Sequence, residues 1–281
     1  MKLLPPLLPL YFAFAATGAC AQDVQPIKDA GPYVPSPQSV VSDMLRYADV
    51  SDKDFLIDLG SGDGRIVRTA AKIFGARGFG VEIKDDLVKK SNEAAQKEGL
   101  ADRVKFLKQD LFKTDMSQAT VITMYLLPDT VNLLKDKFLA ELKPGTRIVS
   151  HDYPLTGWIP EKYVQMDLED KVQISGVTTT LIYLYIVPAK VAGSWKAQMP
   201  PAMSKQPATL SLKQQLTRVT GSVRLDGKEF PLEEAKLRGD RLTFKLAGRK
   251  GEFSGQVKGR QIEGMVESGG TKSPWSATLG G

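Results

Sequence analysis

Apolar and polar positions follow two alternating periods along the first two thirds of the chain. Short apolar runs, which predict buried strands, occur at 55–59, 79–83, 104–107, 120–126 and 147–150. Other stretches repeat apolar side chains every three or four residues, as on one face of a helix, at 39–48, 65–74, 85–98 and 131–142. Strands that alternate with helices of this length predict a parallel sheet covered by helices on both faces.

Two further apolar runs, at 172–175 and 178–187, follow each other with too little chain between them for a crossover helix. A parallel connection needs about a dozen residues or more, so these runs are predicted to pair antiparallel. The region 39–187 is therefore expected to be an α/β domain with a doubly wound, Rossmann-like sheet of seven strands, the last of them antiparallel.

The pattern changes after residue 187. Residues 188–209 include Pro200, Pro201 and Pro207 and are predicted to be a linker. Residues 210–281 hold short alternating runs separated by glycines, at 222–225, 241–246, 252–257, 261–266 and 275–279. This region is predicted to be a small all-β domain, either an antiparallel sandwich or a barrel.

The N-terminus has the features of a targeting segment. An apolar run at 3–16 is followed by small residues that end at Ala21, so residues 1–21 are predicted to be a signal peptide. Cleavage after Ala21 would remove Cys20, whereas a lipidated Cys20 or a retained anchor are the alternatives. Residues 22–38 are predicted to be an extended arm. An exported location follows, periplasmic or membrane-anchored if the source is bacterial, with no membrane span in the mature chain.

Composition and charge exclude several classes of protein and suggest partners for the C-terminal region. With 42% hydrophobic and 25% charged residues, the chain is not a collagen, a disordered tail or a disulfide scaffold. From Ser194 onward, 15 Lys and Arg stand against 8 Asp and Glu, although the whole chain is only +6. This basic end favours a solvated positive face and leaves an acidic protein, polymer or membrane surface open as a partner. No nucleic acid is expected, because the cations are spread between strands.

Candidate chemistry begins after the first predicted strand, in the segment D-L-G-S-G-D-G at 58–64. Its alternate glycines let the backbone turn sharply and approach a ligand where a Cβ would collide. The helix that follows presents free N–H groups. Taken alone, such a turn is only a tight connection between a strand and a helix.

Two acidic residues favour a nucleoside pocket over that plain interpretation. Glu82 lies at the end of the second predicted strand, where a carboxylate can accept both hydroxyls of a ribose. Asp110 follows the third strand, where it could meet an adenine edge. With one His and one Cys, the chain cannot build a zinc site, and no metal is expected.

These residues carry a family resemblance. Segment 58–64 with Glu82 and Asp110 resembles the class I, seven-stranded S-adenosylmethionine-dependent methyltransferases. Within that class, 33–37, 58–67 and 150–153 resemble a group related to the ATP-synthase c-subunit lysine methyltransferases. The resemblance covers about 32–187 and implies an enzyme that uses S-adenosyl-L-methionine to methylate a protein lysine or another amine.

The resemblance also implies one cofactor site, made by Tyr33, Asp58, Gly60, Ser61, Gly62, Gly64, Glu82, Asp110 and Leu111. The glycines would shape the methionine pocket, and Asp58 would hold the amino group, directly or through water. Glu82 would bind the ribose and Asp110 the adenine amine. The arm that begins at Tyr33 either closes over the methionine end or packs on the surface.

The acceptor side is expected beyond the ends of the fourth and fifth strands, where Tyr125, His151 and Asp152 are the catalytic candidates. Tyr125 lines an acceptor channel or packs at the strand end. His151 accepts a proton or orients the substrate, or it is a hydrogen-bonded structural histidine. The Met-Tyr-Leu-Leu-Pro segment at 124–128 departs from the Asn/Asp-Pro-Pro-Tyr motif of many amide and nucleic-acid-base N-methyltransferases, which disfavours those acceptors.

Two other functions stay open at this point. S-adenosylmethionine is made in the cytoplasm, so an exported protein could bind a nucleoside without catalysis and use its basic β domain as the binding module. A nicotinamide-dependent oxidoreductase is disfavoured by the glycine spacing and by the terminal strand pair. The acids at Asp58, Glu82 and Asp110 favour the methyltransferase, because a pocket that had lost its catalytic function would have no reason to keep all three.

Overall fold

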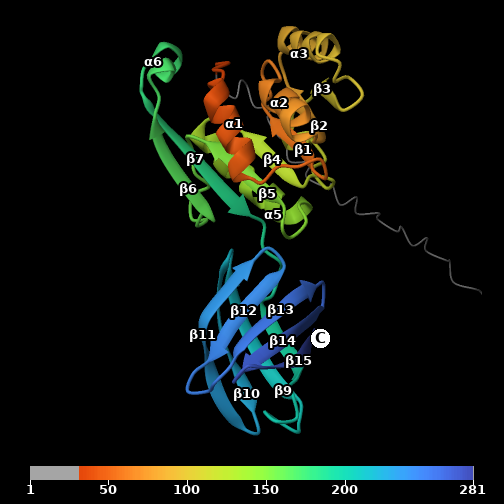
Figure 1. Ribbon diagram of the computed structural model, residues 1–281, viewed down its shortest axis with the longest axis vertical. Helices are drawn as coiled ribbons and strands as arrows, with labels where there is room; N and C mark the ends of the chain where they lie inside the picture. Colours follow the sequence, from red (N-terminus) through yellow and green to blue (C-terminus); the bar gives the residue numbers. More distant parts are fainter. Residues whose placement is uncertain (1–31, 281) are drawn as a thin grey trace, which may run out of the picture.

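The structure, a computed structural model, describes residues 32–280. It consists of a mixed sheet flanked by helices and a closed β-barrel that follows it in the chain (Figure 1). The predicted signal peptide, 1–21, and the first part of the predicted arm, 22–31, lie outside the described residues. Within 32–280, no helix is long and apolar enough to cross a membrane.

The sheet has seven strands in the order β3-β2-β1-β4-β5-β7-β6. Five strands run parallel, namely β1 (Phe55–Leu59), β2 (Arg77–Glu82), β3 (Val104–Lys108), β4 (Val121–Met124) and β5 (Arg147–His151). The strand β7 (Thr179–Ile186) is antiparallel to β5 and to β6 (Lys162–Asp167). The predicted doubly wound sheet is confirmed. Its strand order reverses between β1 and β4, and ligands bind at such a point in open α/β sheets.

Helices cover both faces of this sheet, as the 3.6-residue pattern predicts. One face is covered by α1 (Gln38–Tyr47), α2 (Arg65–Phe74) and α3 (Asp85–Lys97), whose apolar stripes pack with Leu56 and Val121. The other face is covered by α4 (Pro128–Leu133) and α5 (Lys135–Glu141). The single helix expected at 131–142 is thus two short helices.

The prediction for the end of the sheet is partly wrong. Residues 172–175 do not form a strand, because they lie in the helix α6 (Glu169–Ser175). The antiparallel partner of β7 is instead β6, an edge strand whose side chains are alternately exposed and half-buried. An edge strand covered on one face needs few apolar residues, so its pattern is weak in the sequence.

The C-terminal part is a barrel in which each strand pairs with the next and β15 closes on β8. Its strands are β8 (Gly193–Gln198), β9 (Ala208–Gln215), β10 (Arg218–Leu225), β11 (Lys228–Arg238), β12 (Arg241–Leu246), β13 (Glu252–Lys258), β14 (Gln261–Ser268) and β15 (Thr271–Leu279). An aromatic cluster fills the centre, where Phe244 stacks on Phe253 at 4.7 Å and both meet the edge of Trp275.

The predicted linker 188–209 is corrected by this topology. Its residues 193–198 form β8, with Trp195 and Ala197 buried in the barrel and their neighbours exposed. The prolines that suggested a linker lie in the connection between β8 and β9, where no strand hydrogen bonds are needed. Of the two predicted all-β architectures, the structure has the barrel.

Candidate functional site

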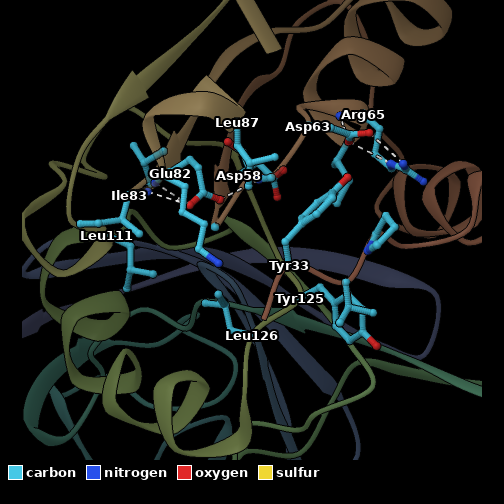
Figure 2. A pocket seen from close by; sticks show the side chains of 18 of the residues that line it. Tyr33, Asp58, Asp63, Arg65, Glu82, Ile83, Leu87, Leu111, Tyr125 and Leu126 are labelled. Carbon is cyan, nitrogen blue, oxygen red and sulfur yellow. Dashed lines mark hydrogen bonds and ion pairs between the residues drawn. The ribbon is translucent and has the colours of Figure 1, made fainter. Parts of the chain in front are cut away.

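A pocket opens at the carboxyl ends of β1, β2 and β4, next to the point where the strand order reverses. It holds about 1120 Å³ of empty space, including the part open to solvent, which is ample for a small-molecule ligand. Nine of the twelve predicted site residues line it, namely Tyr33, Asp58, Gly60, Ser61, Gly62, Glu82, Asp110, Leu111 and Tyr125. The structure therefore brings most of the predicted site into one cavity (Figure 2).

The loop after β1 forms the floor of the pocket. Gly60 and Gly62 have φ angles of +73° and +52°, which non-glycine residues rarely adopt. A Cβ on Gly62 would lie 2.4 Å from the ring of Tyr33, and one on Gly60 would lie 2.7 Å from Leu126. Gly60 also donates its backbone N–H to the carbonyl of Val81 at 3.0 Å. The loop can therefore keep this path only with glycine at both positions.

Gly64 has a different role from the one expected. It does not line the pocket, but it precedes α2 as the N-cap with a φ of +76°. A Cβ there would lie 2.5 Å from the ring of Phe106. The expectation that Gly64 shapes the methionine pocket is corrected, because this glycine is needed for close packing of the helix start on β3.

Asp58 is a buried carboxylate at the pocket wall, with 2% of its surface exposed. Its Oδ1 accepts a hydrogen bond of 2.7 Å from the hydroxyl of Thr123. Burial raises the pKa of Asp58 to about 7, and the negative charges of Asp63 and Glu82 add to the rise, although the bond from Thr123 opposes it. Such a carboxylate is best stabilised by a cation, and the ammonium of a methionine moiety is one.

Glu82 ends β2 with both carboxylate oxygens fixed by backbone donors. Its Oε2 accepts from the N–H of Gly62 at 3.0 Å, and its Oε1 accepts from the N–H groups of Ile83 at 2.8 Å and Lys84 at 3.0 Å. A carboxylate offers about four acceptor positions, so Glu82 keeps capacity for a hydroxyl donor in the pocket. Figure 2 shows this carboxylate beside Asp58, facing the cavity.

Asp110 is positioned by the turn after β3. Its Oδ1 accepts from the N–H of Phe112 at 2.9 Å and caps the short helix η1 (Leu111–Lys113). The preceding residue, Gln109, donates its N–H to the carbonyl of Glu82 at 3.0 Å, which ties this turn to the end of β2. Leu111 is buried and adds an apolar wall.

The arm closes over the pocket rather than packing away from it. Residues 32–36 line the cavity, and the Tyr33 ring lies against Gly62. Arg65 anchors the arm, because its Nη1 donates to the carbonyl of Ser36 at 2.8 Å while its Nε and Nη2 donate to Asp63 at 2.9 and 2.8 Å. The Tyr33 hydroxyl is directed at the same pair (Figure 2). Burial and the charge of Asp63 raise the pKa of Tyr33.

Asp63 and Arg65 line the pocket but were not predicted as site residues. Burial alone raises the pKa of Asp63, yet the bonds and charge of Arg65 bring it below its usual value. The signal in the sequence was an acid and a base two residues apart directly after the glycines. The spacing alone did not show that Arg65 binds the arm through the carbonyl of Ser36.

Tyr125 follows β4 and lines the pocket, with its ring packed on His151 at a centroid distance of 4.0 Å. Burial raises the pKa of Tyr125 well above its usual value, and the charge of Asp152 and a hydrogen bond to it raise it further. The phenol is therefore neutral, and its hydroxyl faces the Asp152 carboxylate. This leaves the lone pairs of its oxygen as acceptors.

His151 does not reach the pocket. It is fully buried, its Nδ1 lies 2.8 Å from the Ser36 hydroxyl, and it supports Tyr125 from behind. Burial lowers its pKa to about 4, so the imidazole is neutral at physiological pH. The expectation that His151 takes a proton from the substrate is corrected in favour of the structural alternative.

Asp152 also lies behind Tyr125, outside the pocket lining. It has a φ of +63°, and its carboxylate accepts from Lys171 Nζ at 2.7 and 2.8 Å and from the N–H of Leu181 at 3.0 Å. The Lys171 side chain is 2% exposed. The sequence analysis did not predict this ion pair, since Lys171 lies in α6, a helix that replaces the strand expected at 172–175.

Known proteins resemble part of this chain. The ANTKMT methyltransferase domain matches residues 58–162. A protein-lysine N-methyltransferase of Saccharolobus islandicus is 41% identical over 157 residues, which cover 56% of this chain and 93% of that protein. The Xenopus laevis enzyme that methylates lysine in the ATP synthase c-subunit is 32% identical over 130 residues, 46% of this chain and 57% of its own length.

A solved structure points to the same cofactor. It is described as an RNA methyltransferase from Salinibacter ruber in complex with S-adenosyl-L-homocysteine. It has 45% sequence identity and a TM-score of 0.51, and the match covers 56% of this chain and 96% of that one. The family-model match ends at residue 162, before the first barrel strand begins.

The residues present fit S-adenosylmethionine. The glycine cradle leaves no room for a Cβ, and Asp58, Glu82 and Asp110 line one cavity from the ends of three neighbouring strands. In the described part of the chain, no group of three or more His, Cys, Asp or Glu could hold a metal ion. The expected cofactor is confirmed, and the chain belongs to the class I S-adenosylmethionine-dependent methyltransferases related to the ATP synthase c-subunit lysine methyltransferases.

Proposed function

We propose that this enzyme transfers a methyl group to the side-chain amine of lysine in a protein. The observation that carries the proposal is the match with the archaeal protein-lysine N-methyltransferase, which is 41% identical and spans 93% of that protein. The pocket itself supplies a carboxylate for an ammonium and an open acceptor side at Tyr125.

The pocket residues divide the cofactor among them in this proposal. Glu82 accepts the ribose hydroxyls, Asp58 holds the amino group and Asp110 accepts from the adenine amine. The arm from Tyr33 covers the methionine end and limits access of water. When bound, S-adenosylmethionine supplies an activated methyl group whose leaving group is a neutral thioether. The protein then contributes mainly alignment and exclusion of water.

The acceptor side favours a neutral amine. Asp152 is engaged by Lys171, and His151 is buried and uncharged, so neither is available to take a proton. Because the Tyr125 phenol is neutral, its oxygen can accept an N–H of the incoming amine and point the nitrogen lone pair into the pocket. The lysine ammonium must therefore lose its proton to water first, and turnover is expected to rise with pH towards the pKa of lysine, about 10.4.

Labelled-methyl transfer tests the proposal. Lysate of the source organism is incubated with the enzyme and methyl-labelled cofactor, the proteins are hydrolysed, and the labelled amino acid is identified. Methyllysine formed by the wild type and lost in Tyr125→Ala supports the proposal. Label in arginine or glutamine with none in lysine would contradict it.

RNA is the second candidate acceptor, because the Salinibacter ruber structure, 45% identical in sequence, is described as an RNA methyltransferase. The same labelled reaction separates the two. Label that is released by ribonuclease and not by protease assigns RNA as the acceptor. A third outcome, binding of S-adenosylhomocysteine with no transfer to any fraction, assigns a non-catalytic nucleoside-binding protein.

Export remains part of the proposal. It rests on the apolar run at 3–16 and the small residues up to Ala21. Cell fractionation and N-terminal sequencing of the mature chain test it. A chain found outside the cytoplasm and beginning at Gln22 supports export, whereas a cytoplasmic chain that retains Met1 rejects it.

A further inference from the structure

Acidic residues are distributed unevenly around the barrel. The strands β15, β8, β9 and β10 are consecutive neighbours in it, and none of them contains Asp or Glu. The acids of the barrel lie on the other strands and on two turns, at Asp226, Glu229, Glu233, Glu234, Asp240, Glu252, Glu263 and Glu267. We call the outward side of β15, β8, β9 and β10 the acid-free face.

The pairing register places cations and hydroxyls side by side on the acid-free face. One row across the four strands runs Thr278, Lys196, Thr209, Arg224. A second row aligns the hydroxyls of Ser194, Ser211 and Ser222. Because neighbouring strands are about 4.8 Å apart, Lys196 and Arg224 lie about 10 Å apart with a threonine between them.

Little on this face offsets its positive charge. Lys196, Lys213, Arg218 and Arg224 are all exposed. Among the described residues, two ion pairs lie at its edges, Arg224 with Glu229 at 3.8 Å and Lys272 with Glu267 at 3.5 Å. The opposite side differs, since Lys245 pairs with Glu234 at 2.7 Å and Lys258 with Glu263 at 2.9 Å. The field of the barrel is therefore concentrated on one side.

The chemistry of the face limits its partner. Protein interfaces centre on apolar or aromatic anchors, and among the described residues of the barrel the one large exposed hydrophobic is Met265, on β14. Single-stranded nucleic acids need aromatic platforms for their bases, which this face lacks as well. Lysine, arginine and hydroxyl groups without anchors suit phosphate groups on a surface.

We propose that the acid-free face binds the phosphate headgroups of an anionic membrane. The sequence favours a lipid surface over the backbone of a nucleic-acid duplex, because the apolar run at 3–16 is predicted to direct the chain to a membrane, whether it is cleaved there or kept as an anchor. The barrel then holds the methyltransferase next to the membrane, and its face acts independently of cofactor and acceptor.

Vesicle flotation tests the proposal. The chain beginning at Gln22 keeps every residue that the structure describes and removes the apolar run, so it measures the face alone. Its binding to phosphatidylcholine vesicles is compared with binding to vesicles that also contain phosphatidylglycerol, at low and at high salt. Binding is expected to require phosphatidylglycerol and to weaken with salt.

Two matched double variants locate the binding. Lys196→Gln with Arg224→Gln removes two cations from the acid-free face and is expected to weaken vesicle binding about tenfold or more. Lys245→Gln with Lys258→Gln removes the same charge from the opposite side and is expected to leave binding nearly unchanged. Equal loss in both variants, or binding that ignores phosphatidylglycerol, overturns the proposal. A duplex RNA that displaces the chain from the vesicles at trace concentration assigns the face to nucleic acid and also overturns it.

Discussion

The sheet and the barrel use their charged residues in opposite ways. In the sheet, Asp58 is buried, and Glu82 and Asp110 are bound by backbone donors, all at one pocket. In the barrel, the interior is apolar and aromatic, and every cation lies outside the core. Burial can shift the pKa of a carboxylate such as Asp58, whereas many exposed cations together produce a positive electrostatic potential at the surface. The sheet region is therefore suited to cofactor binding and catalysis, and the barrel to electrostatic attraction of a surface.

The largest expected effect comes from the buried ion pair behind Tyr125. Lys171→Met leaves the Asp152 carboxylate without its cation and is expected to lower the free energy of unfolding by about 3–5 kcal/mol. Lys245→Met in the barrel breaks an ion pair that is mostly exposed and is expected to change the free energy of unfolding much less. Denaturant unfolding of both variants measures the contrast.

The double variant Lys171→Met with Asp152→Asn serves as the control. Its neutral amide leaves no buried charge, so most of the lost stability is expected to return. If the two lysine variants lose equal stability, the contrast between sheet and barrel is wrong.

The next effect concerns the ribose contact. Glu82→Ala removes charge-assisted hydrogen bonds and is expected to weaken binding of S-adenosylhomocysteine by about 1.5–3 kcal/mol, roughly ten- to a hundredfold. Isothermal titration calorimetry measures it. Glu93→Ala, which removes an exposed carboxylate from α3, is expected to bind as the wild type does. Unchanged affinity in the Glu82 variant would remove the ribose assignment.

The raised pKa of Asp58 predicts that cofactor affinity depends on pH. Its pKa of about 7 means that it is largely protonated at pH 6, and it must ionise to pair with an ammonium. Affinity is therefore expected to fall about tenfold from about pH 8 to about pH 6, with a proton released on binding at the lower pH. The Asp58→Asn variant is expected to bind more weakly, with a flat profile. A wild-type profile as flat as that of the variant would show that Asp58 does not contact the amino group.

The same shift has a consequence for folding. Because the folded-state pKa of Asp58 lies above its ordinary value of 3.8, the native state holds this proton more tightly than the unfolded chain does between about pH 4 and 7. Its contribution to stability is thus lost as pH rises through that window. Asp58→Asn removes this dependence.

The smallest expected effect comes from removal of the barrel. A chain that ends at Val187 is expected to bind S-adenosylhomocysteine within about threefold of the full chain. The reason is that the pocket is lined wholly by residues of the sheet region, and the Salinibacter ruber enzyme is covered to 96% by 56% of this chain. Calorimetry with the truncated chain checks this, and loss of binding in a chain that still folds would make the two parts one functional unit.

The sequence was sufficient for the parts of the fold that bury apolar residues. The strand at 55–59 and the helix at 65–74 have the predicted bounds, because each has a complete apolar pattern. The edge strand β6 and the barrel strand β8 escaped prediction, since one is half-exposed and the other lies beside a proline-rich turn. Periodicity reports burial and carries little information where burial is partial.

The candidate site divides in the same way. Local motifs were enough to predict that Gly60, Gly62 and Glu82 share one pocket. These residues lie at the ends of strands that are neighbours in this fold. The contact of Arg65 with Ser36 and that of Lys171 with Asp152 join segments whose approach depends on tertiary packing. No spacing in the sequence encodes those two contacts.

A crystal structure of the chain with S-adenosylhomocysteine tests the central claim most directly. We expect the ribose hydroxyls within hydrogen-bond distance of the Glu82 carboxylate, the amino group at Asp58, the adenine amine at Asp110 and the sulfur facing Tyr125. A nucleoside bound elsewhere in the chain, or bound with these three carboxylates out of its reach, would contradict the account.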